Sequence, residues 1–132
     1  MKCLRVIAVA LAAVALSPTA ALPHHSNVAY EVTKVITITG VVKNFEWVNP
    51  HTWLHVVVDD GKGGKVEWAC EGRAPGVLGR AGWSRSILKA GETVTVDMSP
   101  AKDGSKVSII ARVTKADGKI LSNQPVFDDR GN

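Results

Sequence analysis

Three features that mark large protein classes are absent from the sequence. After its first 21 residues it has no apolar run near the roughly 20 residues that a membrane-spanning helix needs, so we expect no membrane insertion of the mature chain. It has no Gly-x-Ser-x-Gly elbow, Walker loop or Ser/His/Asp order, so we do not expect an enzyme. It also has no run of Lys or Arg that would mark a basic patch, which argues against a nucleic-acid partner.

The first 21 residues have the order of a secretory signal peptide. Lys2 and Arg5 supply a positively charged start. The stretch from Val6 to Leu16 is unbroken and apolar, and small residues follow it up to Ala21. We expect cleavage near Ala21, and we expect the mature protein to be periplasmic or secreted.

Loss of this leader changes both the cysteine count and the charge. Of the two cysteines, Cys3 leaves and Cys70 remains alone, so no internal disulfide is possible in the mature chain. Cys70 shares a predicted strand face with Val66 and Trp68, and we expect a buried, inert thiol. Two of the 16 Lys and Arg residues also leave, so the formal net charge falls from +4 to about +2. The high isoelectric point is therefore partly a property of the leader.

Alternating apolar and β-branched residues predict a mainly β fold. The predicted strands cover residues 35–42 with a bent continuation to 48, then 51–58, 65–71, 93–99, 107–114 and 120–121. Gly40 within the first strand indicates a bulge or bend. Pro75 and Gly82 are placed to begin and end a short helix.

This order of elements predicts a small five- to six-stranded antiparallel OB-like barrel with one short helical segment between strands 3 and 4. A two-sheet sandwich is the alternative, because alternation with one buried face fits both. The predicted organisation is a signal peptide at 1–21, an N-terminal arm at 22–34, the barrel at 35–122 and a polar C-terminal tail at 123–132.

The Asn49-Pro50 break is followed by histidines on one face of the second predicted strand. Side chains alternate along a strand, so His51 and His55 share a face. At about 3.3 Å per residue they lie roughly 13 Å apart, too far to bind one ion together. His51 is the better candidate because it lies beside the bend, and we expect His55 to be an ordinary strand residue.

His24 and His25 form a second histidine pair, on the N-terminal arm. Imidazole is a good ligand for both Cu(II) and Zn(II). If the arm folds back so that either ring meets His51, the three histidines make a copper or zinc site, with Glu46 or Glu71 as a further ligand. A solvated polar arm with no such role is the alternative.

Tryptophan supplies a different candidate function. A tryptophan left exposed on strands 2 and 3 would offer a stacking surface of the kind that OB barrels use. Trp47 and Trp53, with Asn49 and Glu71 beside them, are the candidate residues for binding a glycan, a peptide or an apolar small molecule. Alternatively, all four tryptophans are packing residues of the core and its rim.

Several short motifs occur in a characteristic order. They are His24-His25-Ser26, Thr39-Gly40-Val41-Val42, Glu46 to His51 with its Asn-Pro-His sequence, Trp68 with Glu71-Gly72, Gly82-Trp83-Ser84, and Leu88 to Gly91. In these, the chain resembles a family of small exported bacterial proteins of unknown function, over nearly all of the mature sequence. The resemblance implies export and a fold similar to periplasmic OB-fold proteins, and it carries no established reaction. The expected partner is a metal ion, a small ligand or another exported protein.

Overall fold

The computed structural model describes residues 28–124. The predicted signal peptide, the two arm histidines His24 and His25, and residues 125–132 of the predicted tail lie outside these described residues. Between residues 28 and 124, no helix is long and apolar enough to cross a membrane.

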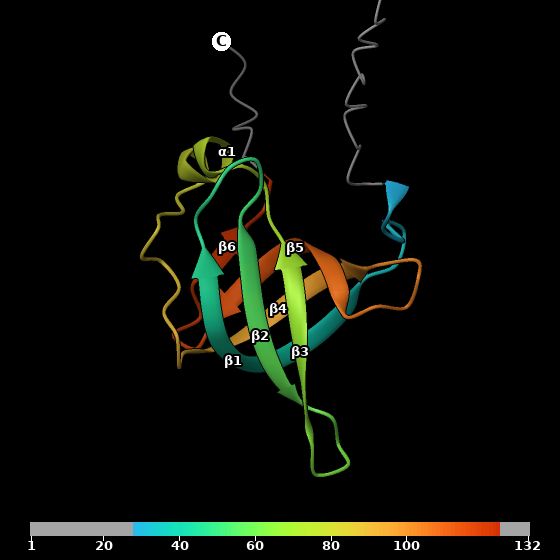
Figure 1. Ribbon diagram of the computed structural model, residues 1–132. Helices are drawn as coiled ribbons and strands as arrows, with labels where there is room; N and C mark the ends of the chain where they lie inside the picture. The colour runs from blue at the N-terminus through green and yellow to red at the C-terminus, as the bar shows by residue number, and fades with distance from the viewer. Residues whose placement is uncertain (1–27, 125–132) are drawn as a thin grey trace, which may run out of the picture.

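Six strands and one short helix make up the described chain (Figure 1). In chain order they are β1 (Ile36–Glu46), β2 (Trp53–Asp59), β3 (Lys65–Glu71), α1 (Pro75–Arg80), β4 (Thr93–Pro100), β5 (Val107–Lys115) and β6 (Ile120–Ser122). The predicted number, type and order of the elements are confirmed, including the bent continuation of the first strand.

The strands close into a barrel. The sheet order is β3-β2-β1-β4-β5-β6, and an additional pairing of β3 with β5 closes the first five strands into a ring that leaves β6 outside. This closing pair is parallel, whereas every other strand pair within the described residues is antiparallel. Closure through β3 and β5 excludes the two-sheet sandwich. The result is a closed five-stranded barrel with β6 as an extra strand and α1 between β3 and β4.

The length of β1 follows from its two partners. Its first half pairs with β4, from Ile36 to Val41, and its second half pairs with β2, from Val41 to Glu46. The register shift lies between Val42 and Asn44, so the bulge is displaced from Gly40, where the sequence indicated it. Gly40 instead permits close approach of two strands, because an added Cβ would collide with the backbone carbonyl oxygen of Val57.

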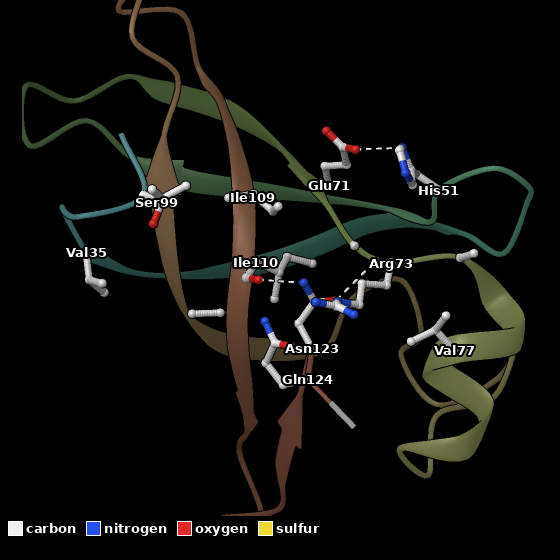
Figure 2. A pocket seen from close by; sticks show the side chains of 14 residues that line it. Val35, His51, Glu71, Arg73, Val77, Ser99, Ile109, Ile110, Asn123 and Gln124 are labelled. Carbon is white, nitrogen blue, oxygen red and sulfur yellow. Dashed lines mark hydrogen bonds and ion pairs between the residues drawn. The ribbon is translucent and has the colours of Figure 1, made fainter. Parts of the chain in front are cut away.

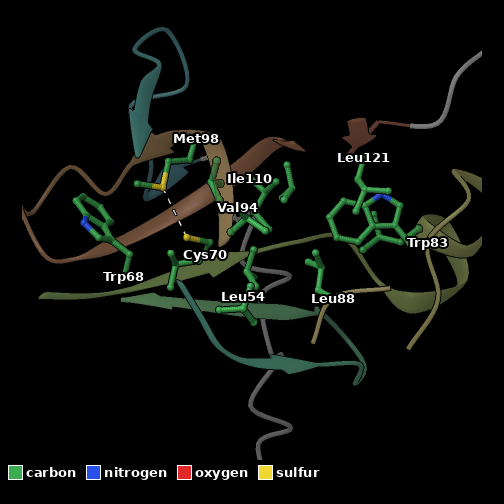
Figure 3. Close-up of a cluster of buried hydrophobic side chains, with 14 residues drawn as sticks. Leu54, Trp68, Cys70, Trp83, Leu88, Val94, Met98, Ile110 and Leu121 are labelled. Atoms are coloured by element: carbon green, nitrogen blue, oxygen red, sulfur yellow. Dashed lines mark hydrogen bonds between the residues drawn. The ribbon is translucent and has the colours of Figure 1, made fainter. Parts of the chain in front are cut away.

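The core fills the barrel with the inward-facing residues of the strands and two tryptophans (Figure 3). Trp68 and Trp83 are both buried. Cys70 is also buried, as predicted, with its sulfur 3.6 Å from that of Met98. Burial raises the pKa of the Cys70 thiol to about 11, so the thiol is protonated at neutral pH.

Candidate functional site

A cavity of about 570 Å³ lies on the outside of the barrel at the seam between β3 and β5 (Figure 2). The segment before β1, the end of β3, helix α1, β4, β5 and the residues after β6 all contribute to its walls. Its lining residues are Val32, Val35, His51, Glu71, Gly72, Arg73, Ala74, Val77, Ser99, Ile109, Ile110, Ala111, Asn123 and Gln124. Two residues singled out from the sequence, His51 and Glu71, are among them.

His51 and Glu71 are joined directly. Nδ1 of His51 lies 2.6 Å from Oε1 of Glu71 (Figure 2). The other carboxylate oxygen of Glu71, Oε2, accepts a hydrogen bond of 2.5 Å from the hydroxyl of Tyr30. Three residues that are far apart in the sequence therefore form a continuous chain, from Tyr30 through Glu71 to His51.

Burial increases along this series of contacts from His51 to Tyr30. The side chain of His51 is 39% exposed, whereas Glu71 is only 6% exposed and Tyr30 only 5%. Burial raises the pKa of Tyr30 above its ordinary value, and the hydrogen bond to Glu71 raises it further. The hydroxyl of Tyr30 therefore keeps its proton at neutral pH and donates a hydrogen bond to the carboxylate of Glu71.

The contact with Glu71 indicates which ring nitrogen of His51 carries a proton. A carboxylate only accepts hydrogen bonds, so the short contact with Glu71 requires a proton on Nδ1 of His51. The side chain of His51 is 39% exposed and lines the cavity. A neutral His51 in this contact therefore has its free lone pair on Nε2.

Two loops are joined beside this pair. The backbone N–H of Gly72 donates to the carbonyl of Thr52 at 2.8 Å, and the hydroxyl of Thr52 donates to the carbonyl of Arg73 at 3.1 Å. A Cβ at Gly72 would collide with the hydroxyl oxygen of Thr52, so this approach requires glycine. The pairing of β2 with β3 thereby continues beyond both strands and brings His51 to Glu71.

His55 lies elsewhere, as the strand spacing predicted. Its Nδ1 lies 3.0 Å from Oε1 of Glu67 and its Nε2 lies 3.3 Å from Oε1 of Glu46. Glu67 also pairs with Lys43 at 2.5 Å, and this pairing lowers the pKa of the Glu67 carboxyl. Both ring nitrogens of His55 face carboxylates across β1, β2 and β3. Glu46, the other acidic candidate ligand, is therefore at His55 and not at the cavity.

The structure does not bring Trp47 and Trp53 together on one surface. The ring of Trp47 lies edge-on to Phe45 at 5.9 Å, and Phe45 lies 5.9 Å from the buried Trp83. Trp47 therefore belongs to the packing at one end of the core. Trp53 pairs with Glu46 and Glu71, while the neighbouring Leu54 points into the barrel, so alternation places Trp53 on the outer face.

Asn49 lies in the connection between β1 and β2 and is exposed, with a cis peptide bond to Pro50. Asn49 is not among the residues that line the cavity. Of the four ligand-binding candidates named from the sequence, only Glu71 lines the cavity.

Three residues of the cavity region were not found from the sequence. Tyr30 is the one tyrosine of the chain, but no local pattern indicates its partner 41 residues away. No pattern in the sequence indicated a role for Arg73. Asn123, placed at the start of the predicted tail, is only 2% exposed. Its amide donates to the carbonyl of Ile110 at 2.7 Å and accepts from the backbone N–H of Arg73 at 3.0 Å.

Among residues 28–124, no set of three or more His, Cys, Asp or Glu side chains is arranged to hold a metal ion. His24 and His25 lie outside that range. Of the three predicted histidine ligands, only His51 lies within the described residues, where it contacts Glu71.

Comparison with known proteins gives one match. The model of a family of unknown function matches residues 10–110 of the chain. No curated protein and no solved structure matches.

Proposed function

The chain belongs to this family of unknown function (DUF6152), whose model covers more than half of it. For this member of the family, we propose a metal-binding role for the site at His51. The proposed ligand is a single Cu(II) or Zn(II) ion, bound through Nε2 of His51 in an exported protein. Copper is the favoured ion, because nitrogen donors bind Cu(II) more tightly than Zn(II).

The contact between His51 and Glu71 is the observation that carries this proposal. Histidines that bind metals almost always donate their other ring N–H to a carboxylate, a carbonyl or a water, which sets the tautomer and makes the ligand more basic. Nδ1 of His51 lies 2.6 Å from Oε1 of Glu71, within ion-pair distance of that carboxylate. Tyr30 in turn fixes the carboxylate of Glu71 from its other side. A buried support behind a half-exposed imidazole is the arrangement expected of a ligand rather than of a surface histidine.

His24 and His25 are the proposed additional ligands. Four residues lie between His25 and Tyr30, and the five Cα-to-Cα steps span at most about 18 Å. Tyr30 is one hydrogen bond from Glu71, and Glu71 is one contact from His51. The proposal requires the arm to fold back from Tyr30 toward His51, and this segment begins beside the partner of His51, Glu71.

Titration calorimetry with Cu(II) and with Zn(II), on protein that has lost its leader, tests the proposal. We expect a dissociation constant of about 1 μM or lower for the preferred ion. His51→Ala should abolish this binding, and the double replacement of His24 and His25 by Ala should weaken it strongly. His55→Ala is the matched control, since both nitrogens of His55 already face carboxylates. Absence of binding by both metals, or full affinity in His51→Ala, would contradict the proposal.

Glu71→Gln tests the orienting carboxylate separately. Glutamine has nearly the same size, but its NH₂ group would donate to Nδ1 of His51 and move the ring proton to Nε2. That nitrogen must be unprotonated to bind a metal. Loss of such a supporting group typically costs roughly 10–100-fold in affinity. We expect a loss in this range while the fold, measured by circular dichroism, is retained.

A further inference from the structure

We propose that the cavity binds a small organic acid, whose carboxylate pairs with Arg73 and whose apolar body lies on the aliphatic wall. This function does not depend on the metal ion proposed above. It assigns a class of ligand to the cavity, which is larger than a metal ion bound at His51 would need.

The charges around the cavity favour an anion. Of the residues that line it, Glu71 is the only acidic one, and its two oxygens are engaged by His51 and Tyr30. Arg73 is exposed, and no carboxylate lies within ion-pair distance of its guanidinium among residues 28–124. The cavity therefore has one cation whose charge is not compensated within the described part of the chain. A guanidinium binds a carboxylate through two parallel hydrogen bonds, a geometry that a neutral ligand cannot reproduce.

Arg73 is held in place by its backbone. Its N–H donates to Oδ1 of the buried Asn123 at 3.0 Å, and its carbonyl accepts from the hydroxyl of the buried Thr52 at 3.1 Å. Asn123 is itself fixed by the carbonyl of Ile110 (Figure 2). Because this backbone is already ordered, less conformational entropy is lost when the guanidinium binds a ligand.

The rest of the wall suits an apolar body. Val32 and Val35, from the segment before β1, are 52% and 60% exposed at the cavity, and Val77 and Ile109 line it as well. Contact of such side chains with an apolar ligand removes their surface from water. The volume of about 570 Å³ lies within the usual range of roughly 300–1,000 Å³ for small-molecule sites. One uncompensated cation beside an aliphatic wall is the pattern expected of a site for a monoanion with a hydrophobic body.

Naphthalene-1-carboxylate and its carboxamide form a probe pair that shares the apolar ring and differs at the carboxyl group, which is charged in one and neutral in the other. Binding of each is measured by fluorescence on the metal-free protein, with a chelator present. We expect the carboxylate to bind and Arg73→Gln to weaken it roughly 10–100-fold, as for loss of hydrogen bonds between charged groups. The carboxamide should bind more weakly and be indifferent to Arg73→Gln. Arg80→Gln is the matched control, because Arg80 is an exposed arginine of α1 that does not line the cavity.

Two further variants separate this proposal from the metal site and from binding elsewhere. Val35→Trp places a large ring at the cavity and should abolish binding of the carboxylate. His51→Ala should abolish metal binding and retain the carboxylate, whereas Arg73→Gln should do the reverse. Equal effects of Arg73→Gln and Arg80→Gln would overturn the proposal, as would equal binding of the two probes. Absence of carboxylate binding in the millimolar range would also overturn it.

Discussion

Tyr30→Phe isolates one hydrogen bond of the site at little cost in packing. The ring of Tyr30 is 5% exposed, and phenylalanine retains that ring and loses only the hydroxyl. The hydroxyl donates to Oε2 of Glu71 at 2.5 Å, and Glu71 is itself 6% exposed. The substitution therefore leaves a buried carboxylate oxygen without its donor, at a position that water reaches poorly.

The expected loss of stability can be estimated from this contact. Hydrogen bonds to charged groups contribute about 1.5–3 kcal/mol to the free energy of unfolding, compared with about 0.5–1.5 kcal/mol for neutral pairs. We expect Tyr30→Phe to cost an amount in the first range. In a Glu71→Gln background the same change removes a neutral hydrogen bond and should cost an amount in the second range. The difference between the two costs measures the part that depends on the charge of Glu71.

Urea unfolding followed by tryptophan fluorescence measures both costs. With a urea dependence of about 1.5 kcal/mol per molar, the midpoint for Tyr30→Phe should fall by about 1–2 M. An unchanged midpoint would refute the inference that this hydrogen bond stabilises the site. Equal costs in the two backgrounds would refute the role of the charge, because the cost would then be the same with a charged and a neutral acceptor.

Two other results are expected. The first concerns Tyr30, the one tyrosine of the chain, whose pKa burial and Glu71 raise above its ordinary value near 10. Ultraviolet difference absorbance should therefore show its ionisation only well above that pH, and Glu71→Gln should lower the pKa. Because the pKa of Tyr30 is raised in the folded protein, the stability that its hydroxyl contributes is complete below about pH 10 and falls as the pH rises further. A folded protein in which Tyr30 titrates at its ordinary pKa would contradict this. The second concerns Gly40→Ala, which should destabilise the barrel by about 1–3 kcal/mol in the same urea assay, since its Cβ would collide with the carbonyl of Val57; an unchanged midpoint would show that β1 and β2 separate without cost.

Local patterns account for the parts of the fold that were predicted. Alternation of apolar side chains along 107–114 or 65–71 is a property of neighbouring residues, so strands and their buried faces can be recognised before the fold is known. The signal from Gly40 was ambiguous for the same reason, since a bulge and a close approach of two strands both require glycine. The register shift between Val42 and Asn44 depends on both partners of β1, which no local window contains.

The candidate site was predicted less completely, because its contacts join distant residues. The sequence indicated His51 as a metal ligand. It indicated Glu71 only as an optional further ligand and as a residue of the separate candidate surface around Trp47 and Trp53. The contact between His51 and Glu71 arises because the loops that contain Thr52 and Gly72 pair beyond the ends of β2 and β3. Tyr30 contacts Glu71 across 41 residues, and Arg73 contacts Asn123 across 50. A single sequence contains no local signal for such pairs.

The sequence by itself therefore determined the mainly β class, the order of strands around one short helix, the burial of Cys70 and the separation of His51 from His55. These follow from periodicity, from turn residues and from the constant rise per residue of a strand. The cavity and the contacts of the candidate site depend on the closure of the barrel. The parallel pairing of β3 with β5 creates the seam at which the cavity lies, and the segment containing Tyr30 lies against that seam. Only this arrangement brings His51 to the buried carboxylate of Glu71 and leaves Arg73 without a carboxylate partner among residues 28–124.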